Sequence, residues 1–125
     1  MFTIDTNFLI AYLGGEAGVV LKIQEWRRHH IALFVSSITQ CELLSYPKLT
    51  PIEEERILRF LQENFILIPF DGDYAKIAAG LRRKKSSLKL PDAAIASVAL
   101  MRNTPLITRN LRDFKKIPNL RIVQI

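Results

Sequence analysis

The feature that most constrains the fold is a regular alternation of short apolar runs with longer segments of helical periodicity. The predicted strands are residues 2–4, 31–35, 65–68, 105–108 and 121–125. Helices are predicted after Asp5 as far as Gly14–Gly15, over 17–28, 38–46 and 51–64, from Asp71 or Asp73 through Leu81, and over 93–102. Parallel strands need long crossover connections, so this alternation predicts an α/β fold with helices on both faces of a parallel sheet.

Composition narrows the class of protein further. With 125 residues and no internal repeat or linker, the chain is expected to form one domain over residues 1–125. No apolar run approaches the roughly 20 residues that span a bilayer, and no signal peptide is evident, so we expect a cytoplasmic protein without membrane contact. Cys41 is the only cysteine, which excludes a disulfide and a cysteine-rich metal site, and we expect it to be packed.

Four acidic residues follow predicted strand ends or open helices at widely separated places. They are Asp5, Glu42, Asp92 and Asp113. Taken singly, each reads equally well as a turn, a helix cap or a solvated carboxylate. In a parallel sheet, however, the segments that follow the strands gather at one edge, where ligands bind. The sequence therefore predicts that the four carboxylates converge.

Local patterns place these acids more closely. Thr6 or Asn7 is expected to cap the first helix, while Asp71 or Asp73 caps a later one. Glu42 shares a helical stripe with Ile38, and Asp92 faces the core from the first turn of its helix. An ionised Asp on such a face needs a partner or a cation.

A converging group of carboxylates persists only with protons or bound cations, because like charges repel. No His or Cys stands at a matching position, so oxygen-only ligation favours Mg²⁺ or Mn²⁺. Such ions activate water and orient a phosphodiester. The formal net charge of +6 favours a polyanionic partner such as nucleic acid. The densest positive run could contact phosphates or simply end a helix in solvent; it comprises Arg82, Arg83, Lys84 and Lys85, with Lys89 beyond.

Four sequence blocks together resemble the motifs of PIN-domain nucleases, and in overall form the VapC-type toxins of toxin–antitoxin pairs. The blocks are residues 4–7 (IDTN), 37–43 (SITQCEL), 90–96 (LPDAAIA) and 106–114 (LITRNLRDF), and the match extends over essentially the whole chain. The resemblance implies a three-layer α/β/α fold with a parallel five-stranded sheet in the order 3-2-1-4-5. It also implies metal-dependent endoribonuclease activity, a homodimer and a VapB-like antitoxin partner.

The resemblance also assigns roles to individual residues. Asp5, Glu42 and Asp92 would be acidic ligands of the metal, with Asp113 as the fourth acid. Asn110 would be a neighbouring polar ligand or would position water; many relatives have Asp there, so whether Asn110 or Asp113 completes the site stays open. Supporting positions are Thr6, Asn7 and Thr108, and Arg109 joins the candidate nucleic-acid-binding residues.

We therefore expect a Mg²⁺- or Mn²⁺-dependent ribonuclease that hydrolyses RNA phosphodiester bonds, the toxin of a type II toxin–antitoxin module. An RNA-binding or RNA-processing protein of the same fold without a toxin role is one alternative, and a structure-specific DNA nuclease is another, since no motif reads the 2′-hydroxyl. A phosphoaspartyl hydrolase would carry a second Asp two residues after its nucleophile, where this chain has Asn7.

Overall fold

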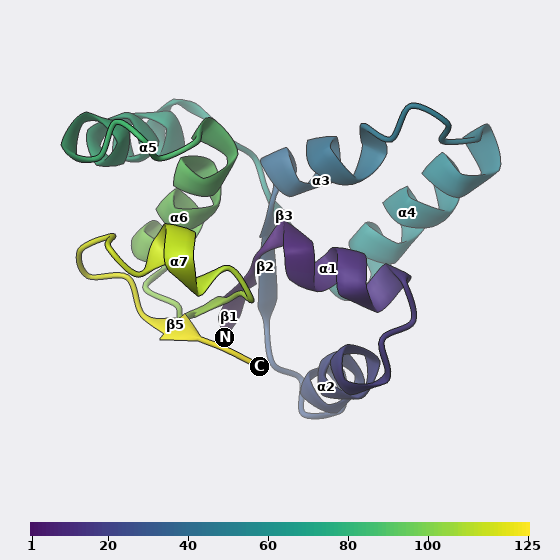
Figure 1. Ribbon diagram of the computed structural model, residues 1–125. Coiled ribbons are helices and arrows are strands. Elements are labelled where there is room, and N and C mark those ends of the chain that lie inside the picture. The colour runs from purple at the N-terminus through teal and green to yellow at the C-terminus, as the bar shows by residue number, and fades with distance from the viewer.

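The computed structural model describes residues 1–125 and contains one five-stranded parallel sheet. The order is β3-β2-β1-β4-β5, which confirms the expected topology (Figure 1). The central strand β1 pairs with β2 on one side and β4 on the other, with Thr3 aligned to both Phe34 and Leu106. The strands are β1 (Phe2–Ile4), β2 (Leu33–Ser36), β3 (Ile66–Ile68), β4 (Leu106–Ile107) and β5 (Ile122–Val123).

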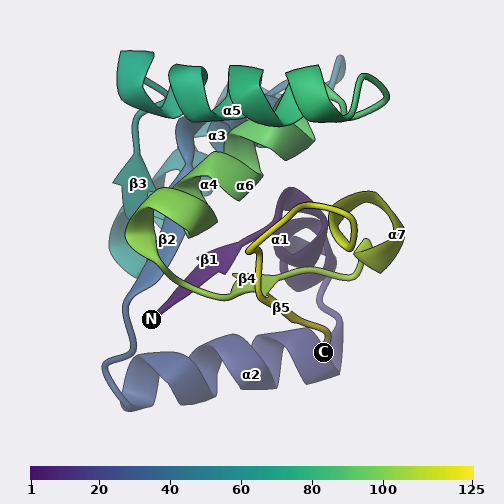
Figure 2. The same cartoon turned by 90° about the vertical axis from the view of Figure 1, so that its left-hand side faces the viewer.

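Helices cover both faces of the sheet, as the alternation predicts. On one face lie α1 (Thr6–Leu13), α2 (Ala17–Arg28), α3 (Ser37–Leu44) and α4 (Pro51–Asn64). On the other face lie α5 (Gly72–Lys84), α6 (Leu90–Arg102) and the short α7 (Leu111–Phe114), as Figures 1 and 2 show together. The result is a three-layer α/β/α arrangement.

Each strand contributes side chains to both faces, because successive residues of a strand point in opposite directions. In β2, Leu33 and Val35 pack into the core under α1 to α4, whereas Phe34 packs on the opposite face with Val98 of α6. Every residue from Ala93 to Ala99 is buried. This stretch of α6 is rich in alanine, so the helix can approach the sheet closely.

Several helix starts follow the expected capping chemistry. The Ser36 hydroxyl accepts a hydrogen bond from the Ile38 amide at the start of α3. Thr50 and Glu53 form a reciprocal capping box at α4, and Asp71 caps α5 by accepting from the Asp73 and Tyr74 amides. These local signals need only neighbouring residues, so sequence alone reveals them.

The expected cap of α1 is wrong. Asp5 occupies the N-cap position without a side-chain capping bond, and Thr6 is already buried inside the helix. The Asp5 carboxylate turns instead to a partner on β4, a tertiary contact that outcompetes the local one. Helix α6 begins at Leu90 rather than Ala93, since Pro91 sits in the first turn, where no amide proton is required.

Other boundaries also differ from expectation. Helix α3 ends at Leu44, before Tyr46; β2 begins at Leu33 and extends to Ser36; and the last strand is reduced to Ile122–Val123. Cys41 is exposed, contrary to expectation, because the buried positions of α3 are Thr39 and Leu43. No helix combines the length and the apolar character that crossing a membrane requires.

Candidate active site

Asp5 lies at the carboxyl end of the central strand, where β1 passes directly into α1. Its backbone amide donates to the Ile107 carbonyl at 3.0 Å, so β4 ends beside it. Its carboxylate is 3% exposed and accepts a hydrogen bond from the Thr108 hydroxyl at 2.7 Å. The sheet register therefore holds this carboxylate and its donor together.

The protonation of Asp5 reflects two opposing influences. Burial raises the pKa of Asp5 above its usual value, and the charges of Glu42 and Asp113 raise it further. Hydrogen bonds from the Thr108 hydroxyl and the Thr6 backbone oppose this rise by stabilising the anion. Burial prevails, which marks Asp5 as a carboxylate in an unfavourable electrostatic position.

Glu42 projects from the second turn of α3 and is held by α1. The Thr6 hydroxyl donates to Glu42 Oε1 at 2.7 Å, and it also lies 2.9 Å from the Thr39 hydroxyl. Because Thr6 uses its only hydroxyl proton on Glu42, the bond between the two threonines has Thr39 as its donor. The three residues form a directed chain that ends on the carboxylate.

Asp92 stands in the first turn of α6 and is half-buried. Burial is the largest cause that raises its pKa to about 6, and the charges of Asp5, Asp113 and Glu42 add to the rise, while Lys89 opposes it. No protein group donates a hydrogen bond to this carboxylate, in contrast to the other three acids. Asp92 therefore bears the electrostatic strain of the group.

Asp113 and Asn110 meet at the start of α7. The Asn110 side-chain amide donates to Asp113 Oδ2 at 2.6 Å, and the Asn110 backbone amide donates to the Thr108 hydroxyl at 2.9 Å. Thr108 consequently links this loop to Asp5. The structure thus places Asn110 in the hydrogen-bond network of the acids, whereas Asn7 is exposed on α1.

The four acids come close enough for the charges of the other three to raise the pKa of Asp92, as the sequence predicts. None of them forms an ion pair; the three ion pairs of the protein are Lys22–Glu25, Arg59–Glu55 and Arg109–Glu16. In this basic protein, the negative charge of the acid cluster (Asp5, Glu42, Asp92 and Asp113) is left without a protein cation. A bound cation is the direct way to compensate it.

The donor chemistry of the acid cluster fits a hard divalent ion, because all of its candidate ligands are oxygen atoms. As the side chains lie, no three Asp, Glu, His or Cys residues are arranged to hold an ion between them. This geometry is compatible with Mg²⁺, which commonly binds through one or two carboxylates and keeps several waters.

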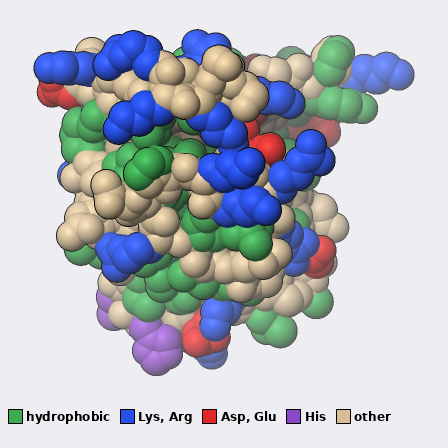
Figure 3. Space-filling view, turned by 60° about the vertical axis from the view of Figure 1, so that its left-hand side comes forward, with side chains coloured by type: hydrophobic (Ala, Val, Ile, Leu, Met, Phe, Trp, Pro, Cys, Tyr) green, Lys and Arg blue, Asp and Glu red, His purple; other side chains and the backbone are tan.

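A cleft of about 760 Å³ opens beside two of the acids, between the α5–α6 connection and α7. On the face that Figure 3 shows, Lys and Arg side chains surround a few acidic ones. We call this cleft the basic cleft; its lining residues are Lys85, Ser87, Leu88, Lys89, Asp92, Asn110, Arg112, Asp113, Lys115 and Lys116.

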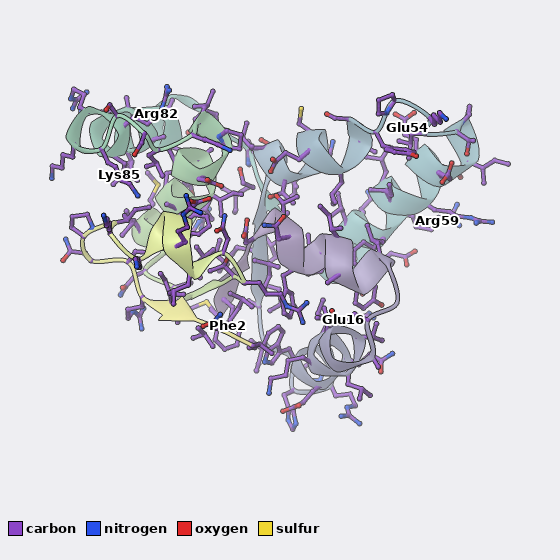
Figure 4. The ribbon with its side chains drawn as sticks, in the orientation of Figure 1. Phe2, Glu16, Glu54, Arg59, Arg82 and Lys85 are labelled. Atoms are coloured by element: carbon purple, nitrogen blue, oxygen red, sulfur yellow. The ribbon has the colours of Figure 1, made fainter.

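The basic residues nominated from the sequence divide into two groups. Lys85 and Lys89 line the basic cleft. Arg82 and Arg83 line a separate hollow on α5, and Arg82 donates to the Leu88 carbonyl, while Lys84 is exposed in the last turn of that helix. Arg109 pairs with Glu16 at the start of α2; Figure 4 labels Glu16, Arg82 and Lys85.

Sequence reasoning missed two sets of residues. Thr39 carried no signal beyond its place in a motif block, because its role depends on a contact with another helix. Arg112, Lys115 and Lys116 flank Asp113 and could have been noticed as a charge run around a candidate ligand. Their common cleft with Lys85 and Lys89 depends on tertiary structure.

Comparison with known proteins agrees with this geometry. The chain is 28% identical to a protein named Ribonuclease VapC from Rickettsia bellii, over 98% of this chain and 94% of that protein. It is 32% identical to a chain in a toxin–antitoxin complex from Klebsiella pneumoniae, with a TM-score of 0.79 over 98% and 96% of the two chains. VapBC2 from Rickettsia felis shares the fold, with a TM-score of 0.80 over 99% and 98% of the chains at 21% identity.

The family assignment rests on the chain as a whole. The sequence model of the PIN domain matches residues 2–120, which includes all four acids and the whole of the basic cleft. The chain therefore belongs to the PIN domain family, and within it is similar to VapC ribonucleases.

Proposed function

We propose that this protein is an endoribonuclease that hydrolyses RNA phosphodiester bonds with the help of Mg²⁺ or Mn²⁺. The observation that carries the proposal is the acid cluster, whose four carboxylates have no protein cation and raise the pKa of Asp92 to about 6. A basic cleft adjoins it, so a polyanion is attracted to a place where a hard cation is also needed. The similarity to proteins named Ribonuclease VapC supports RNA as the substrate.

The residues that would hold the metal are Asp5, Glu42, Asp92 and Asp113, directly or through water, with Asn110 beside them. When bound, the ion would supply Lewis-acid chemistry, polarising the phosphodiester and promoting the ionisation of water. Asp92 is the acid with the strongest electrostatic reason to bind a cation, since its carboxylate has no hydrogen-bond donor.

The surrounding hydroxyl groups would preorganise these ligands. Thr108 orients Asp5, and Thr6, itself held by Thr39, orients Glu42. All three threonines are buried, so their hydrogen bonds are shielded from competing water. A ligand set held in this way loses little conformational entropy when the ion and the substrate arrive.

The biological role we propose is that of the toxin of a type II toxin–antitoxin module, acting in the cytoplasm as a homodimer and inhibited by a VapB-like antitoxin. The support is the similarity to a solved toxin–antitoxin complex. Expression of the chain should arrest cell growth, and co-expression of a small protein encoded beside it should restore growth. Sedimentation of the purified chain tests the homodimer.

The enzymatic proposal is tested with purified protein and matched single-stranded RNA and DNA of the same sequence. We expect cleavage of RNA with Mg²⁺ or Mn²⁺, no cleavage with EDTA, and loss of cleavage in Asp5→Asn and Asp92→Asn. The matched control is Asp73→Asn, because Asp73 is exposed on α5 and accepts no side-chain hydrogen bond.

Two outcomes would contradict this proposal. Equal cleavage by Asp5→Asn, Asp92→Asn and the wild type would indicate a contaminating nuclease or a different site. Metal-dependent cleavage of DNA in preference to RNA would replace the ribonuclease with a DNA nuclease that uses the same carboxylates.

A further inference from the structure

We propose that the basic cleft binds backbone phosphates of the RNA on one side of the cleaved bond, so that the substrate is held from that side only. The inference deepens the proposed ribonuclease function and rests on it. It assigns a role to Arg112, Lys115 and Lys116, which belong to no motif block as ligands, and it separates them from Arg82, Arg83 and Arg109.

The cations of the cleft come from two opposing walls. Lys85 and Lys89 belong to the connection between α5 and α6, whereas Arg112, Lys115 and Lys116 belong to α7 and the turn that follows it. None of these five cations takes part in an ion pair. Their charges are therefore available to an external anion, and two walls can contact a strand from both sides.

The cleft also leads directly to the candidate chemistry. Asp92, Asp113 and Asn110 form part of its lining, so an anion held by the lysines lies next to two acids of the cluster. Two carboxylates in the cleft disfavour an isolated anion. A strand that places one phosphate at a cation bound by the acids and its neighbours among the lysines satisfies both kinds of charge.

The opposite side of the acid cluster lacks such a surface. Asp5 precedes α1 and Glu42 lies on α3, and neither of these helices contains a Lys or Arg. Arg109, which follows Thr108, is engaged by Glu16. Phosphates beyond the acids on this side therefore meet no free cation from α1, α3 or Arg109, and this asymmetry is the physical basis of one-sided binding.

The first test compares two variants that lose the same charge. Lys115→Gln/Lys116→Gln removes two cations of the cleft, and Arg27→Gln/Arg28→Gln removes two exposed cations at the end of α2, outside the cleft. Binding of single-stranded RNA is measured in EDTA, without cleavage, at several salt concentrations. We expect the slope of log K against log salt to fall by about 1.4 in the cleft variant, about 0.7 for each phosphate contact in a single strand.

In the same experiment the Arg27/Arg28 variant should keep the wild-type slope and affinity. With metal present, the cleft variant should raise KM by a larger factor than it lowers kcat. Equal slopes in the cleft variant and the wild type would overturn the inference, as would an equal loss in both variants, which would indicate a general effect of net charge.

The second test extends a short RNA substrate by several nucleotides on the 5′ side or on the 3′ side of the mapped cleaved bond. One series should improve kcat/KM and the other should not, and the improvement should shrink in Lys115→Gln/Lys116→Gln. Improvement from both sides or from neither would contradict one-sided binding. If wild-type protein binds RNA with the expected slope but cleaves nothing with metal, the ribonuclease proposal fails while phosphate binding by the cleft stands.

Discussion

Thr108 donates its hydroxyl proton to Asp5 at 2.7 Å, although the two residues are 103 positions apart in the chain. The bond exists because β4 pairs with β1 in parallel register, so both strands end at the same edge of the sheet. The same hydroxyl accepts from the Asn110 backbone amide. One threonine thus joins the central carboxylate to the loop that carries Asp113.

Replacing Thr108 by Val removes this donor without a large change in side-chain shape. Losing a hydrogen bond to a buried carboxylate should lower the free energy of unfolding by about 1–3 kcal/mol, measured by urea denaturation. The pKa of Asp5, already raised, should rise further, so cleavage should decline at a higher pH on the acidic side of the pH–rate profile. Thr108→Ser keeps the hydroxyl, and an equal loss in both variants would contradict this explanation.

Thr39 should act on Glu42 through Thr6. In Thr39→Val, the Thr6 hydroxyl loses the donor that fixes its direction, so we expect a loss of about 1 kcal/mol in stability and a measurable fall in kcat. Thr39→Ser should restore both quantities. A purely structural role would predict reduced stability with unchanged kcat and unchanged affinity for Mn²⁺, which calorimetry can measure.

The stability of the metal-free protein should depend on the charge of Asp92. Its pKa is raised to about 6 in the folded state from an ordinary value of 3.8, so the folded state binds the proton more tightly than the unfolded state. The free energy of unfolding should therefore fall as pH rises through this window, reach its lowest contribution above about pH 6, and recover below about pH 4. The effect should be of the order of 1 kcal/mol, because Asp92 is half-buried and solvent screens the repulsion.

Asp92→Asn should remove this dependence and stabilise the metal-free protein at pH 7 while abolishing cleavage. Denaturation in EDTA at several pH values measures both effects. Asp73→Asn again serves as the control. A variant that is less stable than the wild type at pH 7, with an unchanged pH dependence, would contradict repulsion as the cause.

Asn110→Asp should exchange an attractive contact for a repulsive one. The Asn110 amide now donates to Asp113 at 2.6 Å, and a carboxylate in its place would add negative charge to the acid cluster. We expect lower stability in EDTA, tighter binding of Mn²⁺ by calorimetry, and a larger rise in melting temperature when metal is added. Unchanged metal affinity would show that position 110 lies outside the ion's surroundings.

Much of the fold could be read from the sequence because its signals are local. Strand runs such as 2–4 and the capping box at Thr50 and Glu53 depend on residues within a few positions of one another. The order of the strands carried no such signal and came from the resemblance of four motif blocks. The short helix α7 escaped prediction, since four residues are too few for a helical period to appear.

For the candidate site, the sequence by itself determined which carboxylates stand at strand ends and helix starts, and hence that acids would gather at one edge. Only the tertiary structure decided which donors hold them: Thr108 for Asp5 and Thr6 for Glu42, across 103 and 36 residues. It also decided that Asp92 has no donor and that Lys115 faces the same cleft as Lys85. The physical reason is that capping and periodicity act between neighbours in the chain, whereas electrostatic strain and charge pairing depend on distances that the sheet order creates.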